Sequence, residues 1–244
     1  TIASNRIDSL CYFIGKLVRF GFFLLMIFSI FRYTDSLAGY KPYEILLFFL
    51  TFNLVDLSGQ AFMRGVYAFR RYVREGGFDY VVSKPINPLF FILSRATDLL
   101  DLLLIPPIVG FIIYCVHILN VDVTITSVLH YLLLLMIGFV IITGFHIIAA
   151  AITITHTENS NSIWLYRDAM TVGRFPPEIF TFALQMFFTF VIPVFIIVAY
   201  PSKAILNELA PKSFSIALVY SILFFSFSLY IWNKSLKKYT SASS

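Results

Sequence analysis

The chain has 244 residues, of which 59% are hydrophobic, 18% are aromatic and only 13% are charged, and its mean hydropathy is +0.85. These values exclude an ordinary water-soluble globular protein and indicate a chain that lies mostly in lipid. The net charge of +5 fits a membrane topology, and we expect no nucleic-acid partner because no basic face belongs to a soluble domain.

Six stretches are apolar and long enough to cross a bilayer, which takes about 20 residues per helix. They cover approximately residues 14–32, 43–63, 97–119, 129–153, 179–200 and 214–233. Residues 1–13 are expected to form the end of an interfacial helix, and residues 201–213 a short outer re-entrant segment. The sequence therefore predicts an all-α polytopic membrane protein with a single transmembrane domain over residues 1–244.

The distribution of Lys and Arg predicts the orientation of these spans. Of the 18 basic residues, 14 lie near the two termini and in the second and fourth connections, and four lie on the opposite side. Because cytoplasmic loops carry the excess of positive charge, we expect both termini and the connection 64–96 to be cytoplasmic, in an inner or plasma membrane.

Charged and polar side chains already stand out in the first two predicted spans. Lys16 and Arg19 at the start of the first can extend toward lipid headgroups. The second carries Asn53, Asp56 and Gln60 in its cytoplasmic half, a polar density too costly to face hydrocarbon. Asp56 could belong to a substrate path or proton relay, or could only bind a neighbouring helix.

The connection 64–96 is predicted to contain a short, rigid helix. The pair Gly76–Gly77 can end a preceding helix at Glu75, because glycine adopts left-handed backbone without steric cost. Asp79 then falls in the first turn of a short helix over about residues 77–83, where a carboxylate suits the positive end of the helix dipole.

A new helix is predicted to begin after the double-proline turn at the end of this connection. Asn87 followed by Pro88 is typical of an N-cap with proline at the first helical position. Further along, Arg95 and Asp98 are spaced for a local ion pair, and Pro106–Pro107 predicts a kink within the third span.

The chain lacks the sequence motifs of the common catalytic and nucleotide-binding sites. There is no P-loop, no dinucleotide-binding glycine motif, no zinc-protease motif and no nucleophile elbow. The four histidines show no metal-ligand spacing, so we expect neither a metal site nor a catalytic residue.

The segment REGGFDYVVSKPINPLF (74–90) is similar to the cytoplasmic signature R-x-G-x-L-D-x-L-L-x-x-P-x-N-P-L of permease subunits of ABC-2 type exporters, in a branch of uncharacterised transport permeases. Two further stretches agree, from Arg174 to Ala204 and from Trp232 to the end of the chain. Phe78 and the pair Val81–Val82 stand where the pattern has leucine, which preserves the apolar face.

The resemblance implies a six-helix, type V exporter-like permease fold in which a coupling helix between the second and third spans contacts a separate ATPase subunit. Carried over by position, the coupling helix is 77–83. The contact residues it implies are Gly77, Phe78, Asp79, Tyr80, Val82, Lys84, Pro85, Asn87 and Pro88.

It also implies a second permease copy, or a related permease, and ATPase subunits that hold ATP and Mg, while this chain holds no cofactor. The substrate path would run between the two permeases, lined by Asn53, Asp56, Phe187 and Phe190. The apolar, aromatic interior favours a lipophilic or amphiphilic substrate such as a drug, a lipid or a lipid-linked molecule.

Two other functions are compatible with the composition. An ion-coupled secondary transporter or small channel would need inverted repeats and charges near the membrane midplane, yet no repeat is evident and the acidic residues cluster near the inner boundary. A membrane-embedded enzyme would have only His146 and Asp56 as candidate groups.

Overall fold

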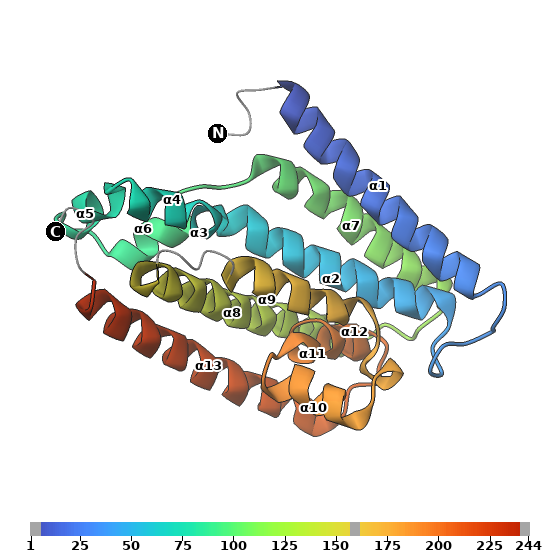
Figure 1. Ribbon diagram of the computed structural model, residues 1–244. Coiled ribbons are helices and arrows are strands. Elements are labelled where there is room, and N and C mark those ends of the chain that lie inside the picture. Colours follow the sequence, from blue (N-terminus) through green and yellow to red (C-terminus); the bar gives the residue numbers. More distant parts are fainter. Residues whose placement is uncertain (1–5, 157–161, 240–244) are drawn as a thin grey trace.

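The computed structural model describes residues 6–156 and 162–239, and within these ranges the regular structure is helical apart from one isolated bridge between Leu37 and Tyr40. Among the described residues, five helices are long and apolar enough to cross a membrane, or six if one bent pair is counted as a span. The five are α1 (Arg6–Ile30), α2 (Pro42–Phe62), α7 (Leu99–Ile118), α8 (Ile125–Thr155) and α13 (Pro211–Lys237) (Figure 1).

The shorter helices fall into two groups. Between α2 and α7 lie α3 (Arg64–Tyr67), α4 (Phe69–Arg74), α5 (Gly77–Val82) and α6 (Pro88–Ser94). Between α8 and α13 lie α9 (Ser162–Met170), the 3-10 helices η2 (Thr171–Arg174) and η3 (Pro177–Ile179), α10 (Phe182–Phe190), α11 (Val194–Ile197) and α12 (Ala199–Ile205).

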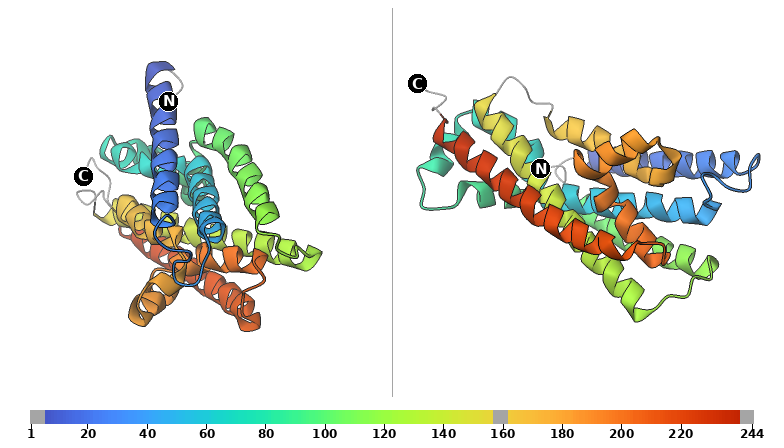
Figure 2. Two further views of the ribbon diagram at one scale, coloured as in Figure 1. Left: turned by 90° about the vertical axis from the view of Figure 1, so that its right-hand side faces the viewer. Right: turned by 90° about the horizontal axis from the view of Figure 1, so that it is seen from below.

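The long helices run side by side, with α2 and α8 in the middle and α1, α7 and α13 around them (Figures 1 and 2). Of the most apolar stretch of each helix, 72% is buried in α2 and 50% in α8, against 6% in α1 and 17% in α13. The outer helices therefore present apolar side chains to their surroundings, as expected for helices that face lipid or another membrane subunit.

The predicted fifth span, 179–200, is broken rather than continuous. Helix α10 ends at Phe190, and α11–α12 continues from Val194 after a bend of 71°. Pro193 lies at the break, where its missing N–H and its ring prevent a regular helical turn. Residues 194–199 are fully buried, so the chain turns into the bundle here, ahead of the expected re-entrant segment 201–213, and α13 begins at Pro211.

The start of the chain also differs from the prediction. Instead of a separate interfacial helix over residues 1–13, helix α1 runs without a break from Arg6 into the first span; residues 1–5 lie outside the described residues. Pro106 and Pro107, where a kink was predicted, lie inside helix α7, which continues through them; a kink there stays a prediction.

The predicted ion pair between Arg95 and Asp98 does not form. Asp98 instead caps the N-terminus of α7 by accepting a hydrogen bond from Leu100 N (3.1 Å), and its other carboxylate oxygen lies 3.6 Å from Nε of Arg64. The Arg95 guanidinium stacks on the ring of Tyr72, 3.6 Å from the centroid. Residues 95–98 are outside both α6 and α7, so the helical spacing on which the ion pair depended is absent.

Candidate functional site

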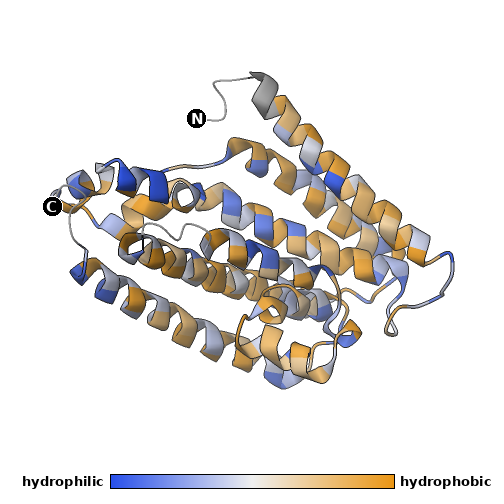
Figure 3. Ribbon diagram, viewed as in Figure 1, coloured by the Kyte–Doolittle hydropathy of each residue, from blue (hydrophilic) through white to orange (hydrophobic). Residues whose placement is uncertain are grey.

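The short helices α3–α6 form a compact unit at one end of the bundle, where hydrophilic residues gather (Figures 1 and 3). Helix α4 ends as predicted: Gly76 has φ = +72°, the left-handed conformation that favours glycine, and α5 begins at Gly77. Asp79 lies in the first turn of α5. The sequence therefore places this helix and its entry turn correctly.

The predicted restart at Asn87 is also confirmed. The Asn87 side chain accepts hydrogen bonds from Leu89 N (2.9 Å) and Phe90 N (3.2 Å), and Pro88 is the first residue of α6. The starts of α5 and α6 are thus both determined by local chemistry, a left-handed glycine before α5 and an asparagine N-cap followed by proline at α6.

Helix α6 packs back against α3 at very close range. A Cβ atom added to Gly65 would lie 2.1 Å from the carbonyl oxygen of Ile92 and 3.3 Å from Cβ of Arg95. Only glycine permits this distance between the two backbones. The contact brings the end of the connection next to its beginning, which makes α3–α6 a closed unit between α2 and α7.

Phe78 of α5 is fully buried and packs against aromatic rings from two parts of the chain. It lies edge-to-face with Phe69 of α4 (5.2 Å between centroids), with Tyr239 (5.0 Å) and with Trp232 of α13 (6.4 Å). The expected partner contact at Phe78 is therefore an internal anchor, because a side chain with no exposed surface cannot touch a partner without leaving the core.

A hydrogen bond reinforces this anchor. The hydroxyl of Tyr239 donates to Oδ1 of Asp79 over 2.7 Å, linking residues 160 positions apart. Burial, together with the Asp79 carboxylate, raises the pKa of Tyr239, so the hydroxyl keeps the proton that it donates. Helix α5 is thus attached to the end of α13 as well as to its sequence neighbours.

The outward face of α5 and of the turn that follows is apolar and exposed. Tyr80 is 62% exposed, Val82 44% and Ile86 43%. Lys84 lies over the ring of Tyr80, 3.9 Å from its centroid, and Pro85 and Asn87 are exposed beside them. We call Tyr80, Val82, Lys84 and Ile86 the α5 tip; it combines an aromatic ring and aliphatic side chains on a rigid support, as residues at protein interfaces do.

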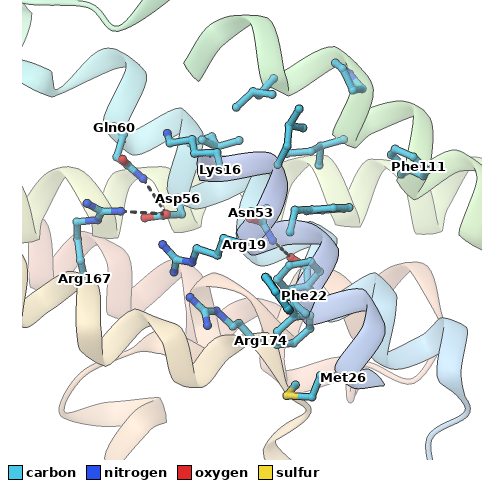
Figure 4. A pocket seen from close by; sticks show the side chains of 18 residues that line it. Lys16, Arg19, Phe22, Met26, Asn53, Asp56, Gln60, Phe111, Arg167 and Arg174 are labelled. Atoms are coloured by element: carbon cyan, nitrogen blue, oxygen red, sulfur yellow. Dashed lines mark hydrogen bonds and ion pairs between the residues drawn. The ribbon is translucent and has the colours of Figure 1, made fainter. Parts of the chain in front are cut away.

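A second candidate site is a cavity of about 360 Å³ between α1, α2 and α7, to which α9 and η2 each contribute one arginine (Figure 4). Two of the four residues predicted to line a substrate path, Asn53 and Asp56, line it; Phe187 and Phe190 of α10 do not. Most of its wall is apolar, with Phe20, Phe23, Phe49, Leu104 and Phe111 among the lining side chains.

The acidic groups at this cavity are already engaged. Asp56 Oδ2 accepts a hydrogen bond from Gln60 Nε2 (2.8 Å) and lies 3.7 Å from Nη2 of Arg167 (Figure 4). Lys16 forms an ion pair with the fully buried Asp101 of α7 instead of extending toward headgroups. Asn53 donates to its own helix, to Phe49 O over 2.7 Å. Asp56 therefore joins α2 to α9.

His146, a candidate group for an embedded enzyme, is buried in α8 and donates from Nδ1 to Ile142 O (2.9 Å). The rings of Tyr67 and Tyr166 lie next to it. In the described part of the chain no group of three or more His, Cys, Asp or Glu residues is placed to hold a metal ion. These contacts are those of a packed core histidine.

Sequence reasoning did not identify two parts of these sites. The contact of α5 with Trp232 and Tyr239 depends on how α13 crosses the bundle, which no local pattern specifies. The gathering of Arg19, Arg167 and Arg174 at one cavity brings together α1, α9 and η2. The two arginines of the fourth connection, Arg167 and Arg174, are the only sequence signal that could have indicated this gathering of arginines.

No curated protein and no solved structure gives a significant match to this chain. A family model described as "ABC-2 family transporter protein" matches residues 17–243, which is nearly the whole chain and includes every helix discussed above apart from the first residues of α1. The chain is a membrane component of the ABC-2 transporter family, whose permeases work with separate ABC ATPase subunits.

Proposed function

We propose that this chain is a permease subunit of an ABC exporter, that it forms a substrate path with a second permease, and that separate ATPase subunits drive it through contacts with the α5 tip. The observation that carries this proposal is that the six-residue helix α5 combines the exposed side chains of Tyr80 and Val82 with the fully buried anchor Phe78. A partner that binds Tyr80 and Val82 can transmit force, because Phe78 prevents α5 from moving independently.

The contacts of α5 supply three routes along which a displacement can travel. Helices α3 and α4 lead back to α2, the buried centre of the bundle. The turn and α6 lead forward to α7, with α6 also held against α3 at Gly65. Trp232 and Tyr239 lead to α13. In this mechanism, ATP-driven closure of the ATPase subunits moves α5 as a rigid body, and the three helices follow.

The orientation in this proposal follows from charge. The excess of Lys and Arg in the terminal regions and in the connections that hold α3–α6 and α9 favours the cytoplasmic side for all of them. That is the side on which ATP is available. Both termini would then be cytoplasmic, and the turn between α1 and α2 would face the opposite compartment.

Replacing Tyr80 with glutamate is expected to release the ATPase subunit while leaving the permease folded. Tyr80 is 62% exposed, so the change costs little stability, but it places a charge at the centre of the proposed interface. Loss of a central tyrosine commonly costs about 2 kcal/mol, which is roughly a 30-fold loss of affinity. The measurement is recovery of an ATP-binding subunit with the tagged full chain from native membranes.

Tyr33 offers a matched control, because it is 92% exposed in the turn between α1 and α2. Tyr33→Glu introduces the same charge on the opposite side and should leave recovery unchanged. Equal recovery of the ATP-binding subunit with wild type and Tyr80→Glu, or its absence from wild type, would contradict the proposed docking site.

A further inference from the structure

We infer that the cavity between α1, α2 and α7 binds an amphiphile with an anionic headgroup, and that this is the class of molecule the complex moves. The assignment of this amphiphile as the transported substrate depends on the proposed function, whereas its binding in the cavity does not. Its basis is the combination of a positively charged end and an apolar wall in one cavity of suitable size (Figure 4).

The charges at the cavity do not balance. Four basic side chains line it, those of Lys16, Arg19, Arg167 and Arg174, against one carboxylate, Asp56. Lys16 is paired with Asp101 from outside the lining, and Arg167 lies beside Asp56. In the described part of the chain, neither Arg19 nor Arg174 has a carboxylate within ion-pair distance.

Of these two cations, Arg174 gives the stronger evidence for an anion-binding site. Its Nε is buried and has no hydrogen-bond partner among the described residues. The guanidinium lies over the rings of Phe52 (5.0 Å) and Phe23 (5.8 Å). Burial, and next the nearby Arg19, lower the pKa of Arg174. The carboxylate of Asp56 acts on Arg174 only from beyond ion-pair distance, because it is paired with Arg167. A half-buried cation without a directly bound counter-charge is costly, so a bound anion would complete this site.

Arg19 and Arg174 lie next to each other although they come from α1 and η2 (Figure 4). Two adjacent guanidinium groups offer several N–H donors to the oxygens of a single phosphate, sulfate or carboxylate group. An amine or quaternary ammonium headgroup would meet only repulsion from them, because Asp56 and Asp101 already have basic partners. Charge complementarity therefore selects an anion.

The rest of the cavity selects a hydrocarbon tail. Phe20, Leu104 and Phe111 are among its apolar lining residues, and Phe22 on α1, which also lines it, is 69% exposed. Helix α1 has only 6% of its apolar stretch buried, so the cavity is bordered by a surface that can face lipid. A free inorganic anion would leave this apolar wall uncovered, which an amphiphile would fill.

The test uses the purified full chain without any ATPase subunit, in detergent micelles that contain equal amounts of phosphatidylglycerol and phosphatidylcholine with the same acyl chains. Native mass spectrometry counts which lipid stays bound. We expect wild type to retain phosphatidylglycerol at least about tenfold more than phosphatidylcholine, which corresponds to about one charge-assisted hydrogen bond. The double variant Arg19→Gln, Arg174→Gln should lose this preference.

Three controls test whether the preference depends on the positive charge at these two positions, and whether the site binds a lipid rather than a free anion. Arg19→Lys with Arg174→Lys keeps the charge and should keep most of the preference, whereas Arg32→Gln in the turn after α1 should have no effect. Excess inorganic phosphate should not displace the lipid. No preference in wild type, an unchanged preference in the Gln double variant of normal thermal stability, or displacement by phosphate alone would each overturn the site.

A second measurement addresses the substrate assignment. In the complex purified with its ATPase subunit, phosphatidylglycerol should stimulate ATP hydrolysis of wild type and not of the Gln double variant. Binding without stimulation would overturn the substrate class. Absence of a phosphatidylglycerol preference in wild type, together with normal recovery of the ATPase subunit, would overturn this inference and leave the proposed function intact.

Discussion

Replacing Gly65 with alanine is expected to open the α3–α6 unit and to abolish recovery of the ATPase subunit. The new Cβ would lie 2.1 Å from Ile92 O, less than any stable contact between these atoms, and a backbone carbonyl cannot rotate away as a side chain can. Helix α6 must therefore move away from α3. Overpacking of this kind costs about 3 kcal/mol at the upper end of its usual range, visible as a lower thermal unfolding midpoint.

Gly110→Ala is the matched control for this substitution. Gly110 is also helical, in α7, and nothing lies within 4 Å of a Cβ added there, so alanine should be neutral or slightly stabilising because it is the better helix former. Hydrogen exchange should locate the effect of Gly65→Ala in residues 64–98. A Gly65→Ala protein as stable and as protected in this segment as wild type would show that α3 and α6 are not in close contact.

The second large effect is expected from Phe78→Ala. Truncating a fully buried phenylalanine costs roughly 3–5 kcal/mol from lost transfer free energy and the cavity left behind. Here the cavity would lie between Phe69, Trp232 and Tyr239, so α5 should detach from α13. We expect a lower unfolding midpoint and loss of ATPase stimulation even where the ATPase subunit still binds the exposed Tyr80.

Phe90→Ala serves as its control, since Phe90 lies in the same connection and is 71% exposed. It should change stability by no more than about 0.5 kcal/mol, as surface substitutions usually do. If Phe78→Ala left stability and ATPase stimulation at the level of Phe90→Ala, the anchoring role of Phe78 would be wrong.

Local chemistry explains which elements could be predicted from the sequence. The left-handed Gly76, the dipole-facing Asp79 and the Asn87–Pro88 cap each act within a few residues, so their pattern is visible in the chain alone. The apolar stretches of the long helices are equally local, because lipid requires each spanning helix to satisfy its own backbone.

The parts that could not be predicted depend on contacts between distant segments. Lys16 was expected to extend toward headgroups, but the buried Asp101, 85 residues away, binds it. Arg95 and Asp98 do not pair because residues 95–98 lie between α6 and α7 and are not helical. Asp98 instead caps the N-terminus of α7. Phe187 and Phe190 lie on α10, before the break at Pro193, and do not line the cavity that Asn53 and Asp56 line, so their role in a path between two permeases stays a prediction.

The most direct test of the docking proposal is photo-crosslinking from position 80 in native membranes. A photoreactive phenylalanine analogue replaces Tyr80 in one protein and Tyr33 in another, both of which are exposed, and the crosslinked partners are identified by mass spectrometry. Docking of an ATPase subunit at the α5 tip predicts that position 80 forms crosslinks to a protein with a P-loop ATPase motif and that position 33 does not. Crosslinks from position 80 only to lipid, or ATPase crosslinks only from position 33, would contradict it.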